Sequence, residues 1–488
     1  MPTRHDTFSL IPGGILLANL ANATPATAQA TGASPSQDLA KRTIQRRAVE
    51  AAIWGQPIVM FDAMRQAYFR DAKAKYNDII WWPKGADWRS QDLTPNTVAR
   101  YLFFFGNTAI DGPVVFELPG GSAGAVFLGN FCDAWWVPLV DVGLSGEDKG
   151  KGGKYLVLPA DYKGEVPTGY IPVRTSTSNY FMGLRSILES YSETNVRAGD
   201  GLVRQIKVYP LSKTANPPEQ RRIDMTDNIF EALPHYDESF YPSLARMLNE
   251  EPVQERDKVM MGMLLSLGIE KGKEFKPSAA MDAELKLSAQ EAQAFLIEGL
   301  VRTSQKYWPD RKWVVPMPAI SAPVPPTAPH WAPQFKWEVA NYFDMDSRAI
   351  TLASFFCPPV KLGTGAYYLG IFEDAGGQPL RGNNTYQLRV PAGVPARQFW
   401  SVTIYSQETA ALFHDSTRVA IGSTDPSVKK NADGSVDIYI GPKAPVGQES
   451  NWLYTPAGKG WWPWFRFFGP EPALWDKTWK LPDLELMQ

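Results

Sequence analysis

Residues 431–440 read NADGSVDIYI, and this stretch decides the structural class of the second half of the chain. Asp433-Gly434 is typical of a tight two-residue hairpin turn, because both residues tolerate the positive φ angles that such turns need. The residues from Val436 to Ile440 then alternate apolar and polar side chains, as a half-buried strand does. The stretch therefore predicts a β-hairpin.

Similar segments recur on both sides of this hairpin. They are short, rich in β-branched and aromatic residues, and separated by turn-forming residues at a spacing typical of a β-sandwich. We therefore expect residues 341–488 to form an all-β, jelly-roll-like sandwich. Its predicted strands are residues 350–356, 367–372, 386–390, 399–405, 436–440 and 464–468.

The first half of the chain mixes helical and β patterns. Apolar residues at helical spacing predict helices on either side of Pro57 and again over residues 176–192. Short β-type runs lie between them, at residues 101–105, 114–118, 126–128 and 155–158. The fold class is therefore α+β, with a mixed helix and antiparallel-sheet domain over residues 31–205 and a helical segment over residues 206–307 packed with it.

A proline-rich stretch separates the two halves. Prolines crowd residues 308–340, and proline lacks the backbone N–H that a helix interior requires. We predict an extended connector here, and it is the main domain boundary.

The first thirty residues resemble a secretory signal peptide. Arg4 precedes an apolar run over residues 8–20, and small residues then lead to Ala28-Gln29-Ala30. The run is shorter than the roughly 20 residues needed to cross a bilayer, and no later segment offers an uninterrupted apolar run of that length. We expect cleavage after Ala30 and a soluble periplasmic or secreted protein with no integral membrane segment.

Charge and metal-ligating residues exclude several classes of function. Lys and Arg total 49 against 51 for Asp and Glu, a net charge of −2, so nucleic acid is not an expected partner. After cleavage the only histidines are His235, His330 and His414, which are far apart in sequence. We expect neither a metal site nor a cofactor.

The two cysteines, Cys132 and Cys357, lie in opposite halves of the chain among apolar neighbours. An oxidising compartment would permit a disulfide, although two separate buried cysteines are the more common arrangement. Their relation depends on how the two halves dock, and both interpretations stay open here.

Tryptophans cluster beside prolines and glycines, as in Trp81-Trp82, Trp135-Trp136 and Trp461-Trp462. Their ring faces suit stacking on sugars or aromatic rings, although core packing and subunit interfaces also concentrate tryptophan. The leading hypothesis is a protein that binds a ring-containing small molecule or oligosaccharide in a cleft between the two domains. The predicted ligand-binding residues are Trp135, Trp136, Arg174, Tyr180, Arg185 and Trp400.

Two other classes of function stay open. A cofactor-independent hydrolase or lyase could use Asp133 as general base, with an arginine that stabilises the developing anion. Alternatively, the protein is an assembly module whose tryptophans are buried in a homo-oligomer.

Residues 120–124 match the G-x-S-x-G nucleophile elbow of hydrolases. The elbow requires a helix after it, and a β-type run follows here instead. We therefore expect these residues to form a turn.

Several longer motifs resemble a known pair of bacterial domains. NTYQLRVP at 384–391, QFWSVTIY at 398–405 and the 431–436 hairpin resemble the domain of unknown function 1214. Thr94-Pro95-Asn96, YLVLP at 155–159 and the segment from Arg174 to Arg185 look like its companion, the domain of unknown function 1254. The resemblance implies an exported protein with an α+β first domain and a jelly-roll-like second domain, and it implies no established reaction.

Overall fold

The computed structural model describes residues 35–318, 335, 337–338, 340–416 and 418–487. The predicted signal peptide lies outside the described residues, as do residues 319–334 of the predicted connector. Residues 43–488 form one compact unit, and the contacts below lie within it.

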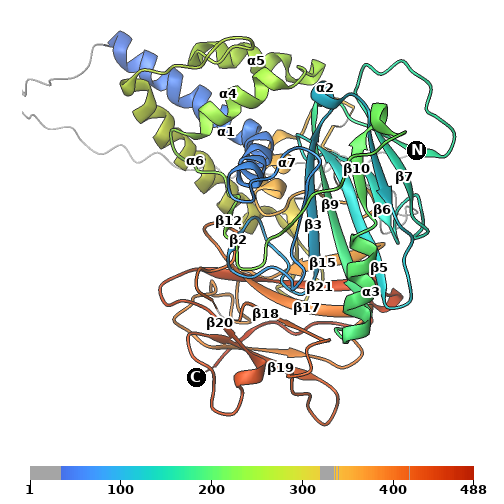
Figure 1. Cartoon of the computed structure of the whole chain (residues 1–488). Coiled ribbons are helices and arrows are strands. Elements are labelled where there is room, and N and C mark those ends of the chain that lie inside the picture. The colour runs from blue at the N-terminus through green and yellow to red at the C-terminus, as the bar shows by residue number, and fades with distance from the viewer. Residues whose placement is uncertain (1–34, 319–334, 336, 339, 417, 488) are drawn as a thin grey trace, which may run out of the picture. The chain divides into compact units, whose positions relative to one another are not determined.

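Two β-sheets pack face to face in the first half of the chain (Figure 1). Phe104 and Phe131 of the larger sheet contact Phe116 of the smaller one, with ring centroids 5.5 and 5.6 Å apart. The larger sheet has six strands, in the order β11 (Arg222–Asp224), β1 (Ile79–Trp81), β3 (Arg100–Asn107), β9 (Asn179–Leu188), β5 (Ala125–Asp133) and β6 (Pro138–Gly143). The smaller sheet has four, in the order β10 (Lys207–Pro210), β4 (Val114–Leu118), β7 (Gly153–Leu158) and β8 (Tyr170–Arg174).

The helix predicted over residues 176–192 is wrong, because strand β9 occupies this segment and lies in the middle of the larger sheet. Its residues alternate between two buried faces, with Tyr180 toward the smaller sheet and Phe181 toward the helices. A strand that is buried on both faces shows no polar and apolar alternation. Its hydrophobic pattern therefore cannot be distinguished from that of a buried helix.

Helices cover the second face of the larger sheet. Phe61 of α1 (Pro35–Arg70) packs edge-on against Phe105 of β3, with ring centroids 5.2 Å apart. Pro57 does not end this helix as we predicted, since buried side chains on both sides of it supply the packing that offsets its cost of ~3 kcal/mol. The other helices of this half are α2 (Thr108–Asp111), α3 (Glu193–Val203), α4 (Phe240–Glu250), α5 (Lys258–Leu264) and α6 (Ala279–Thr303).

The second half also contains two sheets packed face to face, as Tyr386 and Trp461 show across the interface, with ring centroids 5.5 Å apart. One has six strands, in the order β13 (Ser304–Lys306), β14 (Val314–Pro318), β15 (Ala366–Gly370), β21 (Trp461–Pro470), β17 (Ala396–Ser406) and β18 (Ala420–Gly422). The other has four, in the order β20 (Trp452–Tyr454), β19 (Val436–Gly441), β16 (Tyr386–Val390) and β22 (Glu485–Leu486). The short strands β2 (Ser90–Gln91) and β12 (Phe230–Glu231) pair separately. The α+β class is confirmed, whereas the strand order does not confirm the jelly-roll detail.

One predicted strand of the second half is wrong, because residues 350–356 begin within helix α7 (Met345–Leu352). Asp344 caps this helix by accepting a hydrogen bond from the Ser347 N–H at 3.1 Å. The short helix α8 (Pro472–Trp475) follows β21.

Of the helices that the structure describes, none combines the length and the apolar character that crossing a membrane requires.

The two halves meet at inner strands of their larger sheets. Leu128 of β5 and Ile187 of β9 share one apolar cluster with Phe399 of β17 and Phe468 of β21. Strands β9 and β21 both contribute to the wall of one interior space.

Candidate functional site

Three of the predicted ligand-binding residues are buried in the core of the first half. Trp135 and Trp136 are only 2% and 0% exposed, and Trp136 packs on Phe61 and Phe181. Tyr180 is fully buried between the two sheets of the first half. Stacking on a ligand needs an accessible ring face, so these side chains stabilise the fold at the positions where the structure places them.

Asp133, the predicted general base, closes its own turn at the end of β5. Its Oδ1 accepts hydrogen bonds from the N–H groups of Trp135 at 2.8 Å and Val137 at 2.9 Å, and its Oδ2 accepts one from Ser176 at 3.0 Å. Burial raises the pKa of this carboxyl, and the same hydrogen bonds oppose the rise. Both oxygens are therefore occupied in holding the turn.

Arg174 and Trp400 lie apart from those residues and from each other. Arg174 is exposed at the end of β8, whereas Trp400 lies in the second half and stacks on Phe465 at 5.5 Å with an interplanar angle of 15°. Of the predicted site residues, only Arg185 lines the cavity that we describe next. The structure therefore does not gather the predicted set around one cleft.

A cavity lies where the larger sheets of the two halves approach each other. Counted together with the solvent space at its mouth, its volume is about 640 Å³. Both halves contribute to its wall, the first with Arg185 of β9 and the second with Arg466 of β21. The remaining polar lining includes Asp92, Asn96, Tyr101, Asn130 and Tyr368, and the aromatic lining consists of Trp82, Phe103, Phe181, Phe355, Phe356 and Trp464.

Each arginine in this wall is paired with a tyrosine on the neighbouring strand. Arg185 lies opposite Tyr101 in the β3–β9 register, and Arg466 lies opposite Tyr368 in the β15–β21 register. The Arg185 guanidinium lies 5.2 Å from the centre of the Tyr101 ring and donates a hydrogen bond to its hydroxyl at 2.9 Å. The Arg466 guanidinium lies 5.5 Å from the centres of both the Tyr368 and the Tyr405 rings. One arginine from each half, each beside tyrosine rings, thus lines the same cavity.

Polar atoms in the wall are left without partners. Arg466 donates from Nη2 to the Thr94 carbonyl at 2.8 Å, but its Nη1 has no partner among the described residues. The same holds within the described chain for Asp92 Oδ1, Asn96 Nδ2 and Trp464 Nε1, all buried atoms. An unsatisfied buried polar group costs about 1–3 kcal/mol. A concentration of such atoms around one cavity indicates that ligand or water atoms occupy it.

The buried Asp92 predicts an unusual dependence of stability on pH. The side chain is 2% exposed, and burial raises its pKa well above the usual value, although its own backbone N–H and Arg466 act in the opposite direction. An aspartate in the unfolded chain has a pKa of ~3.9. Between this pH and the raised pKa of the folded state, folded Asp92 is protonated while unfolded Asp92 has released its proton. The free energy of unfolding therefore falls as the pH rises through this range. Asp92→Asn, which mimics the protonated acid, is expected to raise the melting temperature at pH 7.

The melting temperatures of the variant and the wild type should converge below pH 4, where aspartate is protonated in both states. Asp161→Asn, at an exposed position, is the matched control and should show no such pH-dependent difference. If the Asp92→Asn variant were less stable than the wild type at pH 7, the conclusion that Asp92 is protonated in the folded protein would be wrong.

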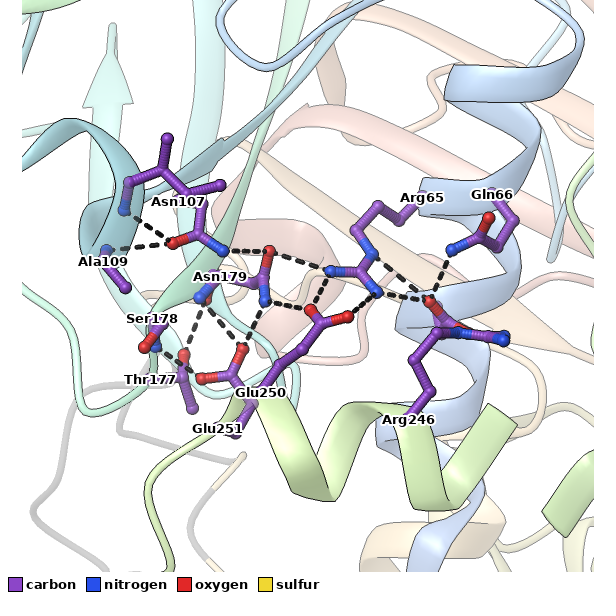
Figure 2. Close-up of polar contacts among 12 residues, drawn as sticks. Arg65, Gln66, Asn107, Ala109, Thr177, Ser178, Asn179, Arg246, Glu250 and Glu251 are labelled. Carbon is purple, nitrogen blue, oxygen red and sulfur yellow. Dashed lines mark hydrogen bonds and ion pairs between the residues drawn. The ribbon is translucent and has the colours of Figure 1, made fainter. Parts of the chain in front are cut away.

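A second polar cluster lies at the other end of β9, and Figure 2 shows its contacts. Arg65 of α1 donates to Asp62 Oδ1 at 2.7 Å, to Asn179 Oδ1 at 3.0 Å and to Glu250 Oε1 at 3.1 Å. Glu251 accepts hydrogen bonds from the backbone and the side chain of Asn179, at 2.9 and 2.6 Å. The cluster ties α1 and α4 to the start of β9. Because these charges already have partners, we assign it a structural role.

The two polar clusters are separate. Asn179 and Arg185 are six positions apart on β9, which corresponds to roughly 20 Å at ~3.3 Å per residue. No group of three or more His, Cys, Asp or Glu side chains among the described residues is arranged to hold a metal ion. The cavity is therefore the stronger candidate site.

Comparison with known families agrees with this two-part arrangement. Residues 76–210 match the model described as "Protein of unknown function (DUF1254)", and residues 365–472 match that of "Protein of unknown function (DUF1214)". The chain carries a DUF1254 domain followed by a DUF1214 domain. Arg185 and Tyr101 lie in the DUF1254 region and Arg466 and Tyr368 in the DUF1214 region, so both domains build the cavity.

Two solved structures resemble the chain over most of its length. The VPA0106 protein from Vibrio parahaemolyticus is 18% identical with a TM-score of 0.53, covering 91% of this chain and 100% of its own. A putative uncharacterized protein from Burkholderia cenocepacia is 12% identical with a TM-score of 0.41, covering 93% and 96% of the two chains. The first likeness shows the fold alone. No curated protein matches the sequence.

Arg466 and Asp92 are the two other charged residues of the cavity wall, and our sequence-based prediction missed both. Arg466 is the only charged residue of the otherwise apolar strand WWPWFRFFGP, which is nearly all buried. A charge in such a strand is itself a sequence feature that indicates a buried polar role, because arginine is rarely buried without partners. Asp92 lies in a loop of the DUF1254 domain, and no periodicity marks it.

Proposed function

We propose that the DUF1254–DUF1214 chain binds a small molecule that carries a ring and an anionic group in the cavity between its two domains. The observation that carries the proposal is that one arginine from each domain, Arg185 beside Tyr101 and Arg466 beside Tyr368, lines the same cavity. Each arginine presents a cation beside an aromatic face.

The anionic group is inferred from the partners of the two guanidiniums. Within the described residues, Arg185 donates to the Tyr101 phenol and Arg466 donates to the Thr94 carbonyl, and neither of these acceptors is a carboxylate. Arginine presents several N–H donors in a planar fork that matches a carboxylate. Charge-assisted hydrogen bonds to an anion would also use the partnerless Nη1 of Arg466.

The ring is inferred from the aromatic lining of the cavity. Phe103, Phe181 and Trp464 line the space and offer apolar surface for a planar group. Two cations favour an anionic ring compound over the neutral oligosaccharide that the sequence also suggested.

The proposal does not extend to catalysis through Asp133, because both oxygens of that side chain hold its turn. The proposal keeps the expectation, inferred from residues 1–30, that the protein is exported and binds its ligand in the periplasm or outside the cell.

The test is a ligand panel applied to the full mature chain. The panel contains benzoate, phenylacetate and naphthoate, their uncharged amides, and neutral oligosaccharides. Binding is followed by tryptophan fluorescence, since Trp82 and Trp464 line the cavity, and by thermal stabilisation. We expect stabilisation by one or more carboxylates and none by the matched amides.

Equal stabilisation by acids and amides would contradict the anion-binding role of the arginines. If no compound of the panel stabilised the protein or changed its fluorescence, the proposal itself would be contradicted. Mass spectrometry of the recovered ligand distinguishes a binding protein from an enzyme, since an enzyme would return a changed compound.

A further inference from the structure

The two cysteines of the chain meet beside the cavity, although they lie 225 positions apart in sequence. Cys132 is near the end of β5 and is fully buried, and Cys357 lies in the segment between α7 and β15 and lines the cavity. Their Sγ atoms are 2.8 Å apart. Non-bonded carbon atoms rest about 3.5–4.0 Å apart, and sulfur is larger than carbon, so this approach is closer than ordinary packing.

The backbone around Cys357 is held in place by a second feature. Asn130 of β5 donates from Nδ2 to the carbonyls of Cys357 and Pro358, at 3.1 and 2.8 Å. Cys357 itself has a φ of 45°, in the left-handed region that residues with a side chain rarely adopt. Such a conformation persists only where its surroundings enforce it. Here the enforced conformation places Sγ against Cys132.

We propose that Cys132 and Cys357 form a disulfide that joins the first domain to the segment leading into the second. The oxidant is a small-molecule or protein disulfide of an oxidising compartment. One cysteine thiolate attacks that disulfide and releases its first thiol, and the second cysteine then attacks the mixed disulfide and releases the other. Two protein thiols are oxidised and one external disulfide is reduced to two thiols.

Burial determines when this bond forms and how it responds to reductants. Both sulfurs are buried, and burial together with the Cys357 thiol raises the pKa of Cys132, which lowers the thiolate fraction that exchange requires. The exchange therefore takes place during folding, before the two sulfur atoms become buried. Once formed, the bond resists reductants in the native protein and yields to them only after unfolding. This inference does not depend on the identity of the ligand.

The test measures thiols in the full mature chain. The protein is unfolded and fully reduced, then refolded in a buffer of reduced and oxidised glutathione poised like an oxidising compartment. It is next denatured without reductant and alkylated with iodoacetamide. We expect no alkylated cysteine and an intact mass lower by two hydrogen atoms than that of the reduced chain, whereas reduction before alkylation should give two labels.

Controls separate the bond from other outcomes. Cys132→Ser and Cys357→Ser should each show one labelled cysteine, and the double variant none. Dithiothreitol added to the folded wild type should release no label within the time that releases both in denaturant. Two labelled cysteines in the refolded wild type, or one glutathione adduct with no intramolecular bond, would overturn the proposal.

Discussion

Replacing Arg185 and Arg466 together with glutamine is expected to weaken binding of the best aromatic carboxylate from the panel by at least about 100-fold. Each hydrogen bond to a charged group contributes about 1.5–3 kcal/mol, and a 100-fold change corresponds to about 2.7 kcal/mol. Glutamine keeps part of the side-chain volume and its hydrogen-bonding capacity but removes the charge. Titration of tryptophan fluorescence against ligand concentration measures the dissociation constant.

The matched control for this experiment is Arg174→Gln. Arg174 belongs to the same DUF1254 domain but is exposed and does not line the cavity, so its loss should leave the dissociation constant unchanged. The double variant must keep the wild-type circular dichroism spectrum, because Arg466 also holds the Thr94 carbonyl. A folded double variant that binds the carboxylate as tightly as the wild type would rule out the two arginines as the anion site.

Replacing Arg65 with alanine is expected to lower the free energy of unfolding by about 3–5 kcal/mol, the usual cost of breaking a buried ion pair. Arg65 is 2% exposed, and its partner Asp62 is fully buried. Without the guanidinium, the carboxylate of Asp62 loses its buried counter-charge, and Glu250 loses the partner that links α4 to α1. Urea denaturation followed by circular dichroism provides the measurement.

Arg246→Ala is the matched control, because Arg246 pairs with the same Asp62 from the surface. Its side chain is 45% exposed, and an exposed ion pair contributes about 0–1 kcal/mol. Unfolding should therefore be much less affected than in Arg65→Ala. If the two variants lose equal stability, the burial of the cluster is not what makes Arg65 important.

The strand from Val436 to Ile440 alternates polar and apolar residues because one side faces the core, and the structure confirms it as β19. The hairpin predicted around Asp433-Gly434 is wrong, because β19 pairs with the distant strands β16 and β20. The family resemblance of both regions is also confirmed by the matching models. Strand β9 shows the opposite case, since both of its faces are buried and its pattern was mistaken for a helix.

The candidate site was predicted only in outline. Arg185 lines a cavity to which both halves contribute, whereas Trp135, Trp136 and Tyr180 lie in the core, and a role of any of them in ligand binding stays a prediction. A pair of adjacent tryptophans looks the same in the sequence whether the rings face a ligand or the core. Which of the two they face depends on the position of neighbouring elements, and local sequence does not contain that information.

By itself, the sequence determined the α+β class, the two domain families and the strand from Val436 to Ile440, because periodicity and local motifs are properties of short segments. Only the tertiary structure decided that Arg185 and Arg466 face one cavity and that Cys132 meets Cys357. These pairs are separated by hundreds of residues, and their distances depend on how two sheets dock against each other. Docking is determined by the summed packing of many side chains, which no single stretch of sequence specifies.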